Sequence, residues 1–157
     1  MPLAHRVFAV LAVAAFMSAP SALVKAQTAQ IANGSDTFVS ASSGQADVQA
    51  SGDVFASGAA LVLKGRVAGD AHVTGFDLDV NSDVEGDLYA AGAALAVNAP
   101  VRGDLSLLGF SLRTSDMASV AGNARMLAGS IMIDGAIGGA LSAVGGEITL
   151  NAPVTGN

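Results

Sequence analysis

The sequence predicts an all-β protein that folds as a single-chain parallel β-solenoid, or β-helix, of about six 17-residue coils. Three observations lead to this prediction. A short motif recurs at a fixed spacing, a glycine recurs at one later place in the unit, and two apolar residues one apart then follow. A fixed short period is typical of repeat folds, in which one unit cannot bury its apolar side chains alone.

The recurring motif is an aliphatic residue followed two places later by glycine and three places later, most often, by Asp or Asn. It is clearest at Val84 to Leu88, and it recurs one period earlier at Val67 to Ala71 and one period later at Val101 to Leu105. Further copies begin at Val120, Ile137 and Val154. The Gly and Asp or Asn positions are typical of turns.

The apolar residues of each unit alternate with other residues, which is typical of strands. Stacking the units, with coils about 4.8 Å apart, turns each repeat position into a column. We expect three columns to face inward: Val67, Val84, Val101, Val120, Ile137 and Val154; Leu61, Leu78, Leu95, Leu112, Ile131 and Ile148; and Val54, Ala71, Leu88, Leu105, Ala124 and Leu141.

The N-terminus has the layout of a secretory signal. Met1 to Arg6 is positively charged, Val7 to Met17 is a run of 11 apolar residues, and Pro20 follows. An apolar run this short does not span a bilayer comfortably. We therefore expect residues 1–26 to be a signal peptide cleaved after Ala26, which predicts an exported protein of the periplasm, the cell surface or the medium. The alternative is an uncleaved anchor.

The rest of the chain divides in two. Residues 27–49 are rich in Ser, Ala, Gln and Gly and are expected to form a polar leader that caps the rod, with a strand at Thr37 to Ala41. Residues 50–157 are expected to form the solenoid, whose fourth coil is two residues longer, within Thr114 to Ser119. The last motif, at Val154 to Asn157, resembles the start of a further coil, which favours a fragment of a longer reading frame.

The charge composition argues against two classes of binding partner. Without Arg6 and Lys25 the exported chain has 5 basic and 13 acidic residues, a net charge of −8. This charge argues against nucleic acid, which requires a basic surface, and against anionic membranes. The chain has no cysteine, so neither disulfides nor thiol chemistry are expected.

An acidic column is the one candidate metal site. The Gly-Asp corners stack Asp53, Asp70, Asp87 and Asp104, and carboxylates about 4.8 Å apart repel one another. One interpretation is a cation-binding ladder. The favoured one is that each side chain accepts a backbone N–H in its own turn, because Asn123 can do the same without charge. We expect no cofactor.

Other polar groups do not suggest catalysis. From Asp77 to Glu85, four acidic residues and Asn81 alternate with apolar residues and Ser82, which indicates a solvated outer strand face; a shallow divalent-cation site or a protein contact is the alternative. His72, the only histidine after residue 26, has no recognisable nucleophile partner, so we do not expect an enzyme. Glu85 and Arg102 occupy the same position in adjacent coils and are expected to form an ion pair.

The Val-x-Gly-Asp corners and Gly-x-x-Leu-x-Leu strands over Ala50 to Asn157 resemble the bactofilins, which are polymer-forming bacterial cytoskeletal proteins. The resemblance implies a right-handed triangular β-helix that joins end to end into filaments without nucleotide. Bactofilins work on the cytoplasmic side, whereas this chain begins with an export signal.

These observations lead to three hypotheses, given in order of preference. The first is a non-enzymatic structural or scaffold protein of the cell envelope, a homo-oligomer or filament joined through the residues Ile137, Leu141, Ile148, Leu150 and Val154. The second is a periplasmic or surface binding module that recognises a glycan or an envelope protein along the rod, with Phe76 and Phe110 as contacts. A polysaccharide hydrolase or lyase is third.

Overall fold

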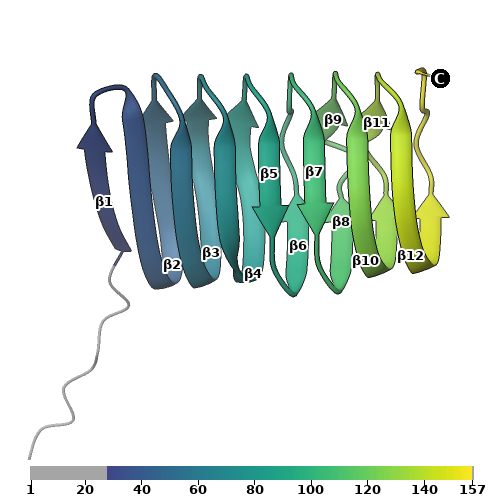
Figure 1. Ribbon diagram of the computed structural model, residues 1–157, viewed down its shortest axis with the longest axis horizontal. Helices are drawn as coiled ribbons and strands as arrows, with labels where there is room; N and C mark the ends of the chain where they lie inside the picture. Colours follow the sequence, from purple (N-terminus) through teal and green to yellow (C-terminus); the bar gives the residue numbers. More distant parts are fainter. Residues whose placement is uncertain (1–27, 157) are drawn as a thin grey trace, which may run out of the picture.

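The computed structural model describes residues 28–156, which form a β-solenoid of about seven turns with 17-residue spacing and no helix (Figure 1). The expected signal peptide lies outside the described residues. The rod begins with β1 (Thr28–Asn33), and the coils then stack along it to the C-terminal end. The prediction of an all-β parallel solenoid is confirmed.

The seven coils follow one another in sequence. The first three are the long bent strands β2 (Asp36–Ala50), β3 (Val54–Val67) and β4 (Ala71–Val84). The later coils are divided into shorter strands: β5 (Leu88–Ala91) and β6 (Ala94–Val97), then β7 (Leu105–Leu108), β8 (Ser111–Thr114) and β9 (Ser119–Val120), then β10 (Ala124–Ile133) and β11 (Ala136–Ile137), and last β12 (Leu141–Leu150). We number these coils 1 to 7 from β2 to β12.

The strands of successive coils pair in parallel and in one register. Val54 lies beside Ala71, Ala71 beside Leu88, and Leu88 beside Leu105, so each step is one full period of the repeat. The three inward columns predicted from the sequence are buried through coils 2 to 6. In coil 7, Leu141 and Val154 are half-buried, and Ile148 is exposed. The core is therefore one continuous stack of aliphatic side chains.

The glycine that recurs after each first strand lies where two coils approach closely. A Cβ atom on Gly75 would lie 1.9 Å from the Gly58 carbonyl oxygen and 2.7 Å from Leu78 Cδ2. A Cβ on Gly92 would lie 2.6 Å from the Gly75 carbonyl oxygen. Real Cβ atoms do not approach oxygen this closely, so the turn requires glycine in these two coils, whereas coils 1 and 6 carry Ala41 and Ala128 at the same position.

The solenoid extends further toward the N-terminus than the sequence predicts. Thr37 to Ala41 is a strand, as expected, but it belongs to β2, which pairs in parallel with β3 along its whole length. The segment expected to be a leader therefore contains a complete coil. The cap is β1, which pairs antiparallel with Asp36–Ala41 of β2 through a turn at Gly34, whose φ is +65°.

The insertion predicted in the fourth coil of the repeat lies in coil 5 of the present numbering, because β2 adds one coil before it. The two extra residues are Asp116 and Met117. On either side of them the backbone keeps the standard path: the Ser115 N–H bonds to the Val97 carbonyl, and Ala118 is buried, as Ala99 is one coil earlier. The Ala118 N–H closes a turn on the Ser115 carbonyl, and Met117 is exposed. The insertion is a small outward loop that leaves the columns unchanged. Among residues 28–156, no helix could span a membrane.

Candidate functional site

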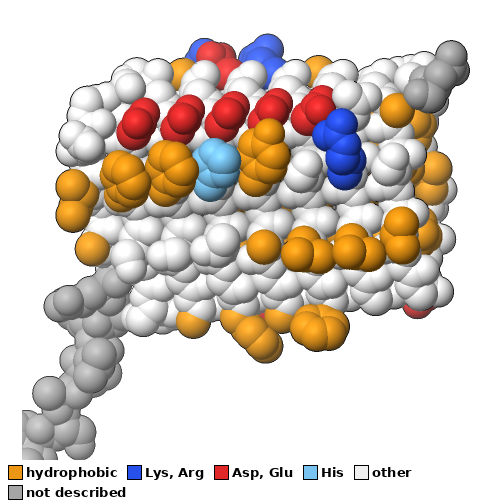
Figure 2. Space-filling view, in the orientation of Figure 1, with side chains coloured by type: hydrophobic (Ala, Val, Ile, Leu, Met, Phe, Trp, Pro, Cys, Tyr) orange, Lys and Arg blue, Asp and Glu red, His pale blue; other side chains and the backbone are white. Residues whose placement is uncertain are grey.

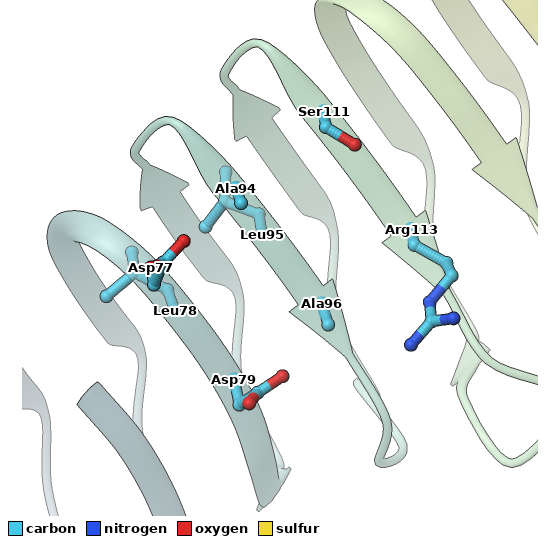
Figure 3. Close-up of a pocket in the computed structure, with 8 residues that line it drawn as sticks. All are labelled: Asp77, Leu78, Asp79, Ala94, Leu95, Ala96, Ser111 and Arg113. Carbon is cyan, nitrogen blue, oxygen red and sulfur yellow. The ribbon is translucent and has the colours of Figure 1, made fainter. Parts of the chain in front are cut away.

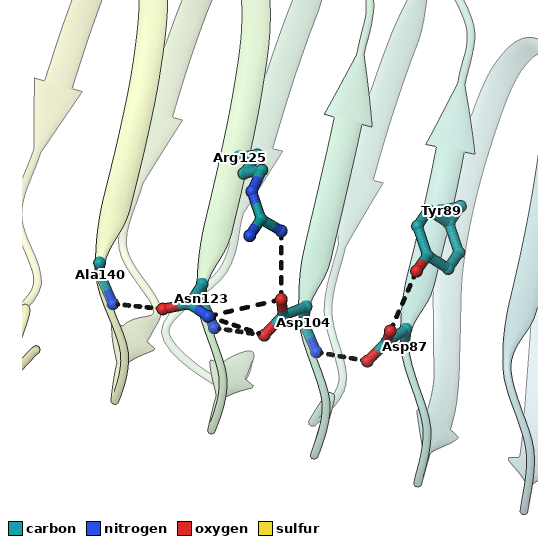
Figure 4. Close-up of polar contacts among 6 residues, drawn as sticks. All are labelled: Asp87, Tyr89, Asp104, Asn123, Arg125 and Ala140. Carbon is teal, nitrogen blue, oxygen red and sulfur yellow. Dashed lines mark hydrogen bonds and ion pairs between the residues drawn. The ribbon is translucent and has the colours of Figure 1, made fainter.

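The acidic column is a ladder of side chain to backbone hydrogen bonds. Oδ1 of each Asp accepts the N–H of the residue at the same position one coil later, at 2.7 to 3.1 Å, and Oδ1 of Asn123 accepts the Ala140 N–H in the same way. Figure 4 shows the links from Asp87 through Asp104 to Ala140. The bond therefore joins neighbouring coils. The prediction that each side chain accepts an N–H within its own turn is wrong.

The column is also longer than predicted. It starts one coil earlier, at Asp36, whose Oδ1 accepts the Asp53 N–H. The five carboxylates form a straight row along the rod (Figure 2). The sequence signal was the 17-residue spacing from Asp36 to Asp53. It was missed because the nearby glycine, Gly34, stands one place off the motif.

At two places the second carboxylate oxygen has a side-chain partner. Oδ2 of Asp87 accepts the Tyr89 hydroxyl at 3.0 Å, and Oδ2 of Asp104 accepts from Arg125 at 3.1 Å (Figure 4). The hydrogen bond to Asp87 raises the pKa of Tyr89, and the nearby carboxylates add to that shift. The hydrogen bond from the Asn123 backbone N–H is the largest cause that lowers the pKa of Asp104, and the hydrogen bond from Arg125 is the next largest.

The four metal-site candidates, Asp53, Asp70, Asp87 and Asp104, thus each use one oxygen to bind the next coil. Within residues 28–156, no group of three or more His, Cys, Asp or Glu side chains is arranged to hold a metal ion. The geometry shows that these side chain to backbone hydrogen bonds fix the register of one coil on the next.

A ladder of rings runs beside the acidic row. The rings of Phe38, Phe55, His72 and Tyr89 stack on one another with centroids 4.8 to 5.2 Å apart and planes within 13° of parallel. Their planes therefore face along the rod and their edges face outward. The three carbocyclic rings remain 38 to 44% exposed. His72 is one rung of this stack.

We define the front face as the outward side chains of the first strand of each coil, two and four residues after the acidic column. The first column comprises Phe38, Phe55, His72, Tyr89, Ser106, Arg125 and Ser142. The second comprises Ser40, Ser57, Thr74, Ala91, Leu108, Leu127 and Val144. The row of rings and, beside it, the aliphatic row at the other end are both visible in Figure 2.

Large and small side chains exchange columns along the front face. In coils 1 to 4 the first column carries rings and the second carries Ser, Thr or Ala, whereas in coils 5 to 7 the second column carries aliphatic residues that are 51 to 65% exposed. Two shallow hollows result. One of about 390 Å³ lies along the rings over Ser40 and Ser57, and one of about 360 Å³ lies along Leu108 and Leu127 over Ser106 and Ser142.

A second face carries opposite charges across a floor of alanine. A hollow of about 520 Å³ is lined by Asp77 and Asp79 on one coil and by Arg113 two coils later, with Ala94 and Ala96 between them. Figure 3 shows Asp79 and Arg113 on either side of Ala96. The expectation that the acidic strand faces outward is confirmed. The hollow offers both an acceptor and a cation to a polar ligand.

The predicted ion pair across the coils exists, and it has a third member. The Glu85 carboxylate lies 4.0 Å from Arg102 Nε, and it also pairs with Arg66, a contact that the repeat pattern does not predict. All three side chains are substantially exposed, so such pairs contribute at most about 1 kcal/mol.

The five predicted self-association residues lie in two different places. Leu141, Ile148, Leu150 and Val154 belong to the last described coil, where Ile148 and Leu150 are 44% and 48% exposed. Ile137 lies one coil deeper and is buried, bridged to Val154 on one side and to Val120 on the other.

No protein-family model matches the chain, and no curated protein or solved structure shows significant similarity to it. The fold is compatible with the bactofilin-like architecture that the repeat motif resembles.

Proposed function

We propose that the protein is a non-enzymatic, exported structural rod of the bacterial cell envelope, which assembles end to end in the manner that its resemblance to the bactofilins implies. Export rests on residues 1–26. The structural role rests on the uniform stack of coils, in which the acidic ladder and the aliphatic columns serve to hold one coil on the next.

The observation that best supports end-to-end assembly is the outer edge of β12. This strand pairs with β10 on one edge, and within the described residues its other edge carries no strand. Ile148 and Leu150 are exposed there, although Ile131 and Ile133, their equivalents one coil earlier, are buried. Such an edge accepts another coil of matching register. The resemblance to the bactofilins implies that a second copy of the chain supplies this coil, and we base the proposal on that resemblance.

The test is assembly of the purified protein, followed by sedimentation velocity and negative-stain microscopy across a range of concentrations. We expect rods that lengthen with concentration, and we expect Ile148→Glu to stop their growth because a charge would be buried at the joint. Thr149→Glu, on the outward side of the same strand, is the matched control and should assemble normally. Normal rods from folded Ile148→Glu, checked by circular dichroism, would contradict the proposal.

A second candidate function is a binding module for a glycan or a protein along the rod. The hollow between Asp79 and Arg113 supports it, together with Phe110, which adjoins the hollow's lining residue Ser111 and is 79% exposed. This function predicts that Phe110→Ala and Arg113→Ala weaken retention on immobilised envelope glycans, whereas Met117→Ala, on the outward loop, does not. Equal retention of all three variants would exclude this face.

A further inference from the structure

Two copies of a surface that carries a ridge beside a furrow can fit together. On the front face, each coil except coil 6 has one large and one small outward side chain. The large one lies in the first column up to Tyr89 and in the second column from Leu108 onward. Coil 6 has two large side chains, because Arg125 stands beside Leu127. The hollows beside the two ridges have similar volumes, about 390 and 360 Å³. The face thus has the steric complement of each of its ridges within itself.

We propose that two copies of the chain pair side by side through their front faces, with the rods parallel and a twofold axis running along the rods between the two columns. This operation places the first column of one copy against the second column of the other, coil by coil. Phe55 then meets Ser57 of the other copy, Tyr89 meets Ala91, and Leu108 meets Ser106. Such an isologous contact closes at two copies.

Arg125 is the one large residue that meets another large residue, Leu127. Its guanidinium is turned away to Asp104, so the methylene stem is left to cover the leucine. The stacked rings also favour this contact. Because they present edges and not faces outward, they act as an apolar ridge that fits a furrow of small residues, and they offer no flat platform for a sugar ring.

Charge selects the parallel arrangement. The acidic row lies along one edge of the front face, from Asp36 to Asp104. With parallel rods, the acidic rows of the two copies lie on opposite edges of the contact. With antiparallel rods most large residues would also meet small ones, but both acidic rows would lie on the same edge, with Asp70 facing Asp104. Like charges brought together in this way oppose that pairing.

The contact is small. Seven coils make a face roughly 34 Å long and about two side chains wide. An interface of this size falls at the low end of the range for specific association. We therefore expect monomer and dimer to exchange at concentrations on the order of ten micromolar. The joint at β12 is separate from this face, so Ile148→Glu should leave the lateral dimer unchanged even where it stops rod growth.

The first experiment measures the dimer by sedimentation velocity of the purified protein, in an Ile148→Glu background if the rods grow. Leu108→Glu, which would place a carboxylate against Ser106 of the other copy, should raise the dissociation constant at least tenfold. The control is Met132→Glu, an outward residue of β10 with similar exposure but on another face; it should dimerise unchanged. A monomer at all concentrations, or equal effects of the two variants, would overturn the proposal.

The second experiment determines direction. The chain contains no cysteine, so Ser57→Cys introduces a unique thiol. In the parallel dimer both copies carry it in the same coil beside the axis, and a short bismaleimide should join them. In the antiparallel dimer the two thiols would be four coils apart, about 19 Å along the rod. Ala96→Cys, on the second face, is the control and should not cross-link. A dimer that gives no Ser57→Cys cross-link would refute the parallel arrangement.

Discussion

At the scale of single residues, Asp70 shows how a column of like charges is maintained. It lies between Asp53 and Asp87, each one coil away, and carboxylates at about 4.8 Å repel one another even near water. Its Oδ1 accepts the Asp87 N–H at 2.8 Å, and its own N–H donates to Asp53 at 2.9 Å. The acceptor oxygen is what the position requires, and the charge opposes the stack.

Replacing Asp70 should therefore separate the hydrogen bond from the charge. We expect Asp70→Asn to be as stable as the wild type or more stable by up to about 1 kcal/mol, with the larger gain at low salt because salt screens the repulsion. Asp70→Ala should lose about 1–2 kcal/mol, since the Asp87 N–H loses its acceptor. Urea unfolding at two ionic strengths measures both. A loss as large in Asp70→Asn as in Asp70→Ala would show that the charge is needed.

Tyr89 offers a direct measure of the same row of charges. It is the only tyrosine, the chain has no tryptophan, and the hydrogen bond to Asp87 raises its pKa above the ordinary value of 10.0. Asp87→Asn should bring the pKa back toward 10, as followed by the ultraviolet absorbance of the phenolate. Asp53→Asn, two coils away, should have a much smaller effect. A pKa that Asp87→Asn leaves unchanged would mean that this hydrogen bond is absent in solution.

The sign of the effect on stability follows from the direction of that shift. The folded state favours the protonated phenol, so Tyr89 contributes its full stabilisation below the pKa of unfolded tyrosine. The contribution is lost as the pH rises through the higher pKa of the folded protein. The free energy of unfolding should therefore fall more steeply above pH 10 in the wild type than in Tyr89→Phe.

At the scale of elements, the loop in coil 5 can be removed to test the repeat. Deleting Asp116 and Met117 joins Ser115 to Ala118 and restores the regular spacing, with Ala118 in the place that Ala99 has one coil earlier. We expect the deletion to change the free energy of unfolding by less than about 1 kcal/mol, because a short exposed loop contributes little. Deleting Asn98 and Ala99 instead should unfold the protein, since Ala99 is buried. Similar losses in both would refute this placement of the insertion.

The sequence predicted the elements that repeat and missed those that depart from the repeat. Alternation and spacing were sufficient to predict the inward columns, because the buried positions of successive coils carry apolar residues at the same places in the repeat. Coil 1 was missed because Ser and Gln fill its outward positions and Gly34 is displaced, so composition suggested a leader. Phe38, the first ring of the stacked ladder, lies in this coil. The exchange of large residues between the two columns of the front face becomes apparent only once the register is known.

At the scale of the whole molecule, the stack predicts a gradient of local stability. In a solenoid each coil contacts only its neighbours, so stability is approximately a sum of coil and interface contributions. Coils 2 to 4 have partners on both edges, whereas β1 is exposed along its whole length and β12 is paired on one side within the described residues.

Hydrogen exchange should therefore be slowest in β3 and β4 and fastest in β1 and β12, because amides exchange through the cheapest local opening that exposes them. Leu63→Ala, in the buried column of coil 2, should weaken protection in β2, β3 and β4 more than in β10. The surface change Met132→Ala is its control. Equal protection from β1 to β12, lowered evenly by Leu63→Ala, would instead mean that the rod opens as one cooperative unit and that its stability is not a sum over coils.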